Sequence, residues 1–186
     1  MWFAQRVKYK NEMKKYGKSG NKEKYAFFHK RQLVQKILLN SLYGVLGLPA
    51  FRFYDIDNAE AVTTTGQTVI KSTADMANIK YNKELGDPEL DSNIYIDTDS
   101  VFFSAAPLLD KRIPSWRDNN QDTIAQYVND IAEEMQDYLN DFYDILSEKI
   151  FNVDKDKHRL EIKKEYVAKA GLWIAKKRYA QWIISD

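Results

Sequence analysis

Cysteine is absent from this 186-residue chain, and so are long apolar runs. Without cysteine there are no disulfides or thiolate metal sites, so carboxylates and the two histidines are the strong ligand candidates that remain. No apolar run approaches the roughly 20 residues of a membrane span, and the first residues lack a signal-peptide pattern. We therefore expect a soluble, intracellular protein.

Proline and glycine are scarce, with 4 and 7 residues respectively, so the few places where they occur stand out. Residues 2–15 and 22–46 are rich in helix formers, and a Gly17–Asn21 segment separates them. The second of these segments ends near Gly47 and Pro49. Two helices joined by a short loop form an antiparallel hairpin, which is the expected structure of the first 48 residues.

The formal net charge of only +1 conceals an uneven distribution. Residues 1–36 contain eleven Lys and Arg but only two Glu, a net charge of +9, while the middle of the chain is acidic. A basic block with interleaved aromatic residues is suited to phosphate or nucleic acid. A solvated helical face is the commoner origin of such a charge run, and both interpretations remain open at this point.

Further along the chain, the pattern predicts several elements and an α+β fold. We expect a short aromatic link with strand character at 51–57, a helix at 58–82 with Val62, Val69, Ala74 and Met76 in the core, and a loop at 107–120. Apolar residues spaced by three or four predict a long amphipathic helix over 121–150. From His158 onward the pattern predicts strands with a turn near Ala170–Gly171, so that helices cover a mainly antiparallel sheet.

The segment Asn93–Ser104 predicts two short strands joined by a tight turn that carries Asp97 and Asp99. Two carboxylates held so close repel each other unless they are solvated, one is protonated, or a divalent cation lies between them. Mg²⁺ typically takes one or two protein carboxylates together with substrate phosphates. The alternative is that Asp-Thr-Asp-Ser is ordinary turn chemistry.

Three separated blocks together resemble the template-directed family B DNA polymerases, the polymerase-alpha-like group of phages, large viruses, archaea and eukaryotes. They are similar to that family's fingers-helix, palm-hairpin and primer-end motifs. In chain order the blocks are Lys36-Ile37-Leu38-Leu39-Asn40-Ser41-Leu42-Tyr43-Gly44, Tyr95-Ile96-Asp97-Thr98-Asp99-Ser100 and Lys176-Lys177-Arg178-Tyr179.

The resemblance implies an antiparallel palm sheet with packed helices plus a protruding helical hairpin, with fingers at 1–48 and a partial palm at 49–186. It also implies a DNA-directed DNA polymerase, of viral or phage type and so in the host cytoplasm or nucleus, that adds deoxynucleotides to a primer by two-metal nucleotidyl transfer. The family's first palm motif, with its own metal-binding Asp, and the thumb are missing from these 186 residues. We expect the chain alone to be inactive and to need an N-terminal polymerase segment or subunit.

The resemblance assigns the catalytic and metal-binding roles to the acids. Asp99 is implied as the first Mg²⁺ ligand and Asp97 as the second, with two ions shared with an Asp outside this chain. Glu165 lies where the family often places an acid near the metals, and a salt bridge to Lys163 or Lys169 is the alternative for it. His29 and His158 have no convincing ligand spacing and are expected to be structural.

The remaining implied contacts are with substrates, primer-template DNA and deoxynucleoside triphosphates. Solvated helix faces are the alternative for the basic residues, and an ordinary core aromatic is the alternative for Tyr43. The nucleotide-binding set is Arg6, Lys10, Lys36, Asn40 and Tyr43, and the DNA-binding set is Gly44, Lys176, Lys177, Arg178 and Tyr179.

A second function remains open from the sequence. In this alternative, the chain is a non-catalytic nucleic-acid-binding remnant whose basic helical hairpin still binds DNA. The joint retention of Lys36, Asn40, Tyr43, Asp97 and Asp99 favours the enzyme interpretation, because decay has no reason to spare all five.

Overall fold

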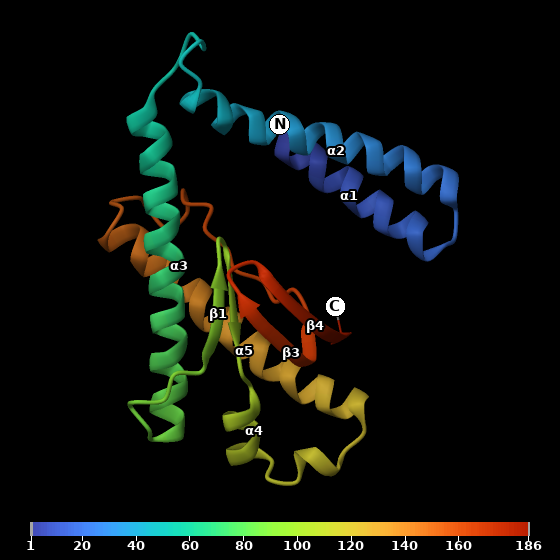
Figure 1. The fold of residues 1–186 in the computed structure, drawn as a ribbon, viewed down its shortest axis with the longest axis vertical. Coiled ribbons are helices and arrows are strands. Elements are labelled where there is room, and N and C mark those ends of the chain that lie inside the picture. The colour runs from blue at the N-terminus through green and yellow to red at the C-terminus, as the bar shows by residue number, and fades with distance from the viewer. Residues whose placement is uncertain (1, 186) are drawn as a thin grey trace. The chain divides into compact units, whose positions relative to one another are not determined.

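The computed structural model describes residues 2–185 and combines long helices with two β-hairpins (Figure 1). Its contacts divide the chain into two compact units, one of residues up to Thr65 and the other from Gly66 onward. The elements in chain order are α1 (Trp2–Lys18), α2 (Lys22–Gly44), the 3₁₀ turn η1 (Val45–Gly47), α3 (Ile56–Leu85), β1 (Asn93–Asp97), β2 (Ser100–Phe103), α4 (Ala106–Arg112), the 3₁₀ turn η2 (Trp116–Asp118), α5 (Gln121–Lys149), β3 (Val167–Ala175) and β4 (Arg178–Ser185).

In the first unit, α1 and α2 form the antiparallel hairpin that the sequence predicted. Half-buried residues recur at three- and four-residue spacing along both helices, so the helices meet along one narrow seam. The rings of Tyr16 and Phe28 stack across it with centroids 5.5 Å apart. Gly20 takes a positive φ of 71° in the connection, and the side chain of Asn21 caps α2 by accepting a hydrogen bond from the Lys24 N–H. The seam residues are Arg6, Tyr9, Met13 and Tyr16 on α1 and Phe28, Gln32, Gln35 and Leu39 on α2.

The strand character expected of the link at 51–57 is wrong, because turns occupy residues up to Tyr54 and α3 begins at Ile56. The side chain of Asp55 accepts a hydrogen bond from the Asn58 N–H at 3.0 Å and so starts the helix. The helix continues through three threonines with poor helix propensity, where the Thr63 hydroxyl donates to the Glu60 carbonyl.

Val62 is also misassigned, since it is 55% exposed rather than part of the core. The other candidate core residues of this helix fare better. Ala74 is buried, and Val69 and Met76 are half-buried. The correct positions lie in the second unit, where other helices cover α3.

The core of the second unit lies where α3, α4 and α5 pack together. Tyr81 from α3, Leu109 from α4 and Met135 from α5 are each exposed by 2% or less and belong to one cluster. The predicted loop at 107–120 is therefore wrong in its first part, because α4 contributes two leucines to this core. Pro107 misled the prediction: proline is well tolerated in the first turn of a helix, where its missing N–H costs nothing.

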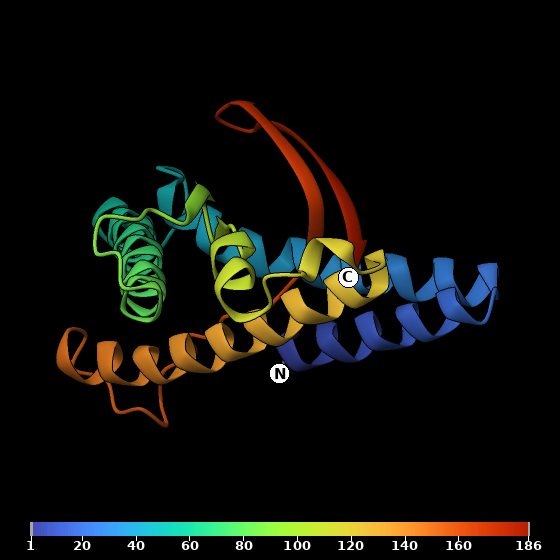
Figure 2. The ribbon, with the colours of Figure 1, turned by 90° about the horizontal axis from the view of Figure 1, so that it is seen from below.

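The long amphipathic helix α5 confirms the sequence prediction. Asn120 caps it by accepting a hydrogen bond from the Thr123 N–H at 2.9 Å. Ile131, Met135 and Leu139 follow one another at four-residue spacing and are all buried. Figure 2 shows α5 from below, passing under the β3–β4 hairpin of the same unit.

The α+β class is confirmed, but the strands form two separate two-stranded antiparallel sheets, β1–β2 and β3–β4. Residues 158–166 are not a strand. They run along α5, where the Asn140 side chain pairs with both backbone groups of Ile162 and the Gln136 side chain accepts the Lys164 N–H. Side chains of α5 thus take the place of a neighbouring strand.

The predicted turn at Ala170–Gly171 is also wrong, because both residues lie inside β3 and the turn is at Lys176–Lys177. The glycine serves packing: a Cβ at Gly171 would collide with the indole ring of Trp173. Glycine in a strand often marks such a close approach.

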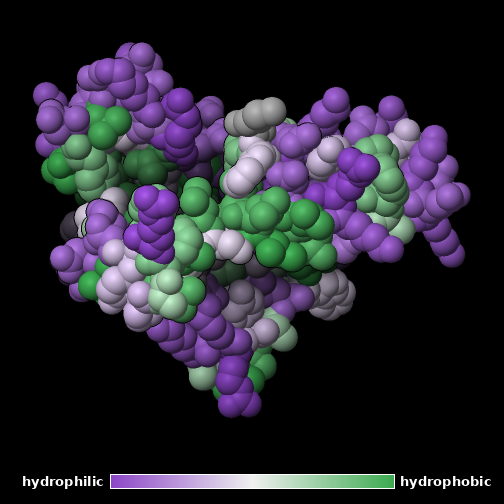
Figure 3. Space-filling model, turned by 90° about the horizontal axis from the view of Figure 1, so that it is seen from above, coloured by the Kyte–Doolittle hydropathy of each residue, from purple (hydrophilic) through white to green (hydrophobic). Residues whose placement is uncertain are grey.

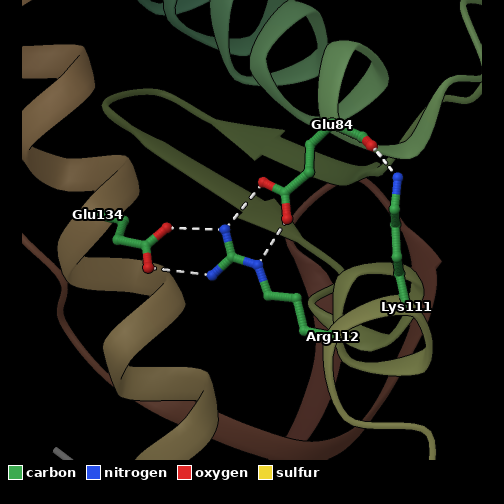
Figure 4. Close-up of polar contacts among 4 residues, drawn as sticks. All are labelled: Glu84, Lys111, Arg112 and Glu134. Carbon is green, nitrogen blue, oxygen red and sulfur yellow. Dashed lines mark hydrogen bonds and ion pairs between the residues drawn. The ribbon is translucent and has the colours of Figure 1, made fainter.

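Arg112 of α4 connects three helices through ion pairs (Figure 4). Its guanidinium donates to the carboxylate of Glu84 on α3 at 2.6 and 2.8 Å, and to the carboxylate of Glu134 on α5 at 3.0 and 2.8 Å. Lys111 donates to the Glu84 backbone carbonyl. The hydrogen bonds from Arg112 hold the pKa values of Glu84 and Glu134 below their usual value.

We predict that Arg112→Met lowers the free energy of unfolding by about 1 kcal/mol at pH 7, a typical value for a partly exposed ion-pair network. The folded-state pKa values of both carboxyls are lowered, so this contribution is present above the unfolded value of 4.5 and is lost as the pH falls through the lowered values. Urea unfolding at pH 7 and pH 3 measures it, and the difference between wild type and variant shrinks at pH 3. Arg117→Met, which breaks the more exposed pair with Asp110, is the control and costs less. Equal losses for the two variants at both pH values would contradict the assignment.

Candidate functional site

The tip of the β1–β2 hairpin carries the two aspartates, as the sequence predicted. Asp97 pairs with Ser100, and Thr98 and Asp99 form the loop between them. Thr98 has a positive φ of 57°, which is rare for a β-branched residue and strained. The Thr98 hydroxyl donates to the Asp97 carboxylate at 3.0 Å and the Ser100 hydroxyl donates to the Asp97 carbonyl at 3.1 Å, so local hydrogen bonds support the strained turn.

The two carboxylates lie in different environments. The side chain of Asp97 is 17% exposed and pairs with the ammonium of Lys177 at 3.2 Å. The Thr98 hydroxyl, and then Lys177, hold the pKa of Asp97 below its usual value. Asp99 is exposed, and its carboxylate forms no hydrogen bond or ion pair with any residue between 2 and 185. Asp99 is therefore the carboxylate available to a ligand.

The turn of the β3–β4 hairpin lies against β1, as Figure 1 shows. Lys177 takes a positive φ of 61° in this turn, and its backbone N–H donates to the Tyr95 hydroxyl at 2.8 Å. Because side chains alternate along a strand, Tyr95 and Asp97 lie on the same face of β1. Lys177 therefore makes two contacts with one face of β1. Sequence reasoning missed Tyr95, although its position two residues before Asp97 was a usable signal.

An aromatic cluster joins the same two hairpins. The ring of Tyr179 on β4 lies 5.6 Å from Tyr95 and 5.7 Å from Phe102, measured between centroids. Trp173 and Tyr166 also contact Phe102, and the Tyr166 hydroxyl donates to the Gln181 side chain at 2.6 Å. Tyr179 thus packs between the hairpins and remains 37% exposed, and the neighbouring Lys176 and Arg178 are also exposed.

Glu165 is exposed and makes neither of the salt bridges considered for it. Lys163 pairs with Glu161 at 2.9 Å, and the ammonium of Lys169 lies 5.0 Å from the ring centroid of Trp182. Within residues 2–185, no three His, Asp or Glu side chains gather as a set that could hold a metal ion. The tip thus offers two carboxylates, which is part of a ligand set.

The predicted nucleotide-binding residues share one side of the α1–α2 hairpin. Lys36, Asn40 and Tyr43 recur at helical spacing about a quarter turn from the seam, and Lys10 lies on the same side of α1. The side chains of Lys10, Lys36 and Asn40 are exposed and have no partner among the described residues. Arg6 lies at the seam, with its Nε buried and unpaired.

Tyr43 and Gly44 end this helix and begin the connection to α3. The Tyr43 hydroxyl donates to the Ala59 carbonyl at 3.3 Å, while the residue as a whole remains 42% exposed. Gly44 has helical backbone angles, and a Cβ there would meet nothing within 4 Å, so nothing in the described chain requires glycine at this position. Its open surroundings leave room for a close approach from outside.

Both histidines make contacts of a structural kind. The His158 side chain is 12% exposed, its Nε2 lies 2.9 Å from the Asp144 carboxylate, and its Nδ1 accepts the Leu160 N–H at 3.1 Å. Since Nδ1 accepts, Nε2 carries the proton and donates to Asp144. The ring of His29 stacks on Tyr25 with centroids 6.0 Å apart.

Comparison with known proteins identifies the family. The family model for DNA polymerase family B matches residues 1–186. The chain belongs to DNA polymerase family B. This family B chain is 33% identical over 158 residues to the DNA-directed DNA polymerase of Enterobacteria phage T4, and the match covers 80% of the chain and 17% of the phage protein.

Similar relatives come from a second phage and from archaea. The DNA-directed DNA polymerase of Escherichia phage RB69 is 32% identical over 168 residues, covering 80% of this chain and 17% of that protein. The DNA polymerase of Thermococcus gorgonarius is 30% identical over 150 residues, covering 81% and 15%. The family B chain therefore spans about a sixth of the length of these polymerases.

No helix among its described residues is long and apolar enough to cross a membrane.

We predict that Lys177→Met raises the pKa of the Asp97 carboxyl, because it removes the ammonium that favours the ionised form. The pKa should return only part of the way to its usual value, because the hydrogen bond from Thr98 still lowers it in the variant. Carboxyl ¹³C NMR titration of Asp97 measures it. Lys163→Met, which removes a lysine paired with Glu161, is the matched control and leaves the Asp97 titration unchanged. An unaltered Asp97 pKa in Lys177→Met would show that the ion pair does not form in solution.

Proposed function

We propose that this chain is the fingers and palm portion of a template-directed DNA polymerase, with fingers at 1–48 and a partial palm at 49–186. The observation that carries the proposal is the strained Asp-Thr-Asp-Ser tip held against the Lys-Lys-Arg-Tyr turn by Lys177. Two sequence motifs that lie far apart in the chain are thus parts of one local structure. The family match supports the reaction class, addition of deoxynucleotides to a primer 3′ end.

The donor chemistry at the tip fits Mg²⁺, which prefers carboxylate oxygens. Asp99 would ligate the metal directly, since its carboxylate has no partner among residues 2–185. Asp97 would support the site as an ionised group beside Lys177. Bound there, a pair of Mg²⁺ ions supplies activation of the primer hydroxyl and neutralisation of the leaving pyrophosphate. The third acid would come from an N-terminal polymerase segment or subunit, with Glu165 as the weaker candidate.

The cationic side of the α1–α2 hairpin would bind the triphosphate of the incoming nucleotide. Lys10 and Lys36 carry no counter-charge from the described residues, so their ammonium groups are free to bind phosphate oxygens. Arg6 and Asn40 would add hydrogen bonds to the same group. The exposed ring of Tyr43 would stack beneath the new base pair, fixed at its hydroxyl by Ala59.

The primer-template duplex would contact the second hairpin and the end of α2. Lys176, Lys177 and Arg178 would bind backbone phosphates, giving salt-dependent binding without sequence preference. Tyr179 would support this surface from the aromatic cluster. Gly44 would let the α2 backbone approach the nascent base pair closely.

The first test is complementation with the N-terminal segment of a family B polymerase that carries the missing Asp. We predict Mg²⁺-dependent primer extension by the mixture and a loss of at least about a thousandfold with Asp99→Asn, because an amide cannot supply the ligand charge. The matched control is Asp91→Asn, which makes the same change two residues before the start of β1. This control variant retains primer extension. Equal extension by wild type and Asp99→Asn would refute the metal role. Binding of DNA without any extension would favour the nucleic-acid-binding remnant.

The second test separates the nucleotide from the DNA in the same complemented mixture. We predict that Lys36→Ala raises the KM for deoxynucleotide about tenfold to a hundredfold, the usual effect of losing a charged hydrogen bond, with little change in primer-template Kd. Lys18→Ala, which removes an exposed lysine elsewhere on the hairpin, is the control. If Lys36→Ala weakened both ligands equally, the residue would belong to a general basic surface.

A further inference from the structure

A hollow lies on the other side of the α1–α2 hairpin from the proposed nucleotide site. Its volume is about 240 Å³, and its lining residues are Tyr9, Lys30, Arg31, Val34 and Gln35. Arg31 and Lys36 are five positions apart on α2, so they diverge by about 140° around the helix axis. The hollow, called the rear hollow below, is therefore distinct from the surface of Lys36 and Asn40.

The rear hollow combines cations with aromatic faces. The Arg31 guanidinium lies 4.7 Å from the ring centroid of Phe27 and 5.8 Å from that of Tyr9. Its only hydrogen bond among the described residues is a long one of 3.5 Å to the Tyr9 hydroxyl. Neither Lys30 nor Arg31 pairs with a carboxylate in the part of the chain that the structure describes. Phe27 keeps half of its surface exposed, at 50%.

The rear hollow also contains an unsatisfied polar group. The side-chain oxygen of Gln35 is buried without a hydrogen-bond partner among residues 2–185. Polar atoms left without a partner in this way are uncommon in folded proteins. Figure 3 shows that hydrophilic side chains dominate the surface of this hairpin, at the right of the view, with a smaller hydrophobic patch among them.

We propose that the rear hollow and Phe27 bind single-stranded DNA. Uncompensated cations beside exposed ring faces are the combination that single strands require, with phosphates on the cations and bases stacked on the rings. In a duplex the base faces are already stacked on one another, so Phe27 would have no base to receive. Lys30 and Arg31 bind the phosphates, and a base stacks on Phe27 beside the Arg31 guanidinium. The site lies within the first unit and does not depend on polymerase activity.

The test measures binding of fluorescent (dT)16 to the full chain by anisotropy across a range of salt concentrations. We predict that Lys30→Ala/Arg31→Ala weakens binding about tenfold, and reduces the slope of log K against log salt by about 1.4, because two phosphate contacts disappear. Lys18→Ala/Lys22→Ala removes the same charge from the same hairpin and serves as the matched control, with a loss below about threefold. Equal losses for the two double variants, or no loss for Lys30→Ala/Arg31→Ala, overturn the proposal.

A second measurement isolates stacking. Phe27→Ala weakens (dT)16 binding by about fivefold or more, the effect of losing one base–aromatic stack, but leaves an abasic strand of equal length unaffected. Unchanged circular dichroism excludes unfolding, and Phe27→Trp restores binding of (dT)16. Equal losses on both strands overturn the stacking role, as would tighter binding of duplex than of (dT)16. The variants could weaken (dT)16 binding as predicted while the complemented chain extends no primer. That outcome would refute the proposed polymerase function but would still support the single-strand site.

Discussion

The contact between Lys177 and β1 is the interaction on which the acidic site depends. The backbone of Lys177 donates to the Tyr95 hydroxyl, and its ammonium pairs with Asp97. Isolated two-stranded hairpins are marginally stable in water, and each sheet of this unit has only two strands. One turn residue, supported by the aromatic cluster behind it, therefore anchors each hairpin to the other and sets the position of the Asp97 carboxylate.

This arrangement makes two aspartates of one tetrapeptide chemically different. Asp97 is kept ionised by the Thr98 hydroxyl and by Lys177, and it is largely covered. Asp99 follows the strained residue Thr98, and its exposed charge has no partner among the described residues. The strained turn and the two neighbouring negative charges cost free energy. Hydrogen bonds and an ion pair made by Asp97 offset that cost. The carboxylate of Asp99 is left free to bind.

The elements predicted correctly are those whose signal is local. The long helices and the Asp97–Asp99 hairpin follow from periodicity, capping and turn chemistry within each segment. The errors arose where tertiary contacts override local pattern. Residues 158–166 alternate like a strand but pair with side chains of α5, and Gly171 looks like a turn residue but makes room for the Trp173 ring. Pro107 opens a helix whose leucines complete the core.

From its sequence alone, the chain was identifiable as a member of DNA polymerase family B, because the three motifs are short runs whose residue types and order can be read directly. The sequence also determined which acids and bases are available. Only the tertiary structure decided that Lys177 contacts Tyr95, a residue 82 positions away, and that Asp97 is paired while Asp99 is not. Such differences arise from the packing of distant segments, and packing depends on the whole fold rather than on any local pattern of residues.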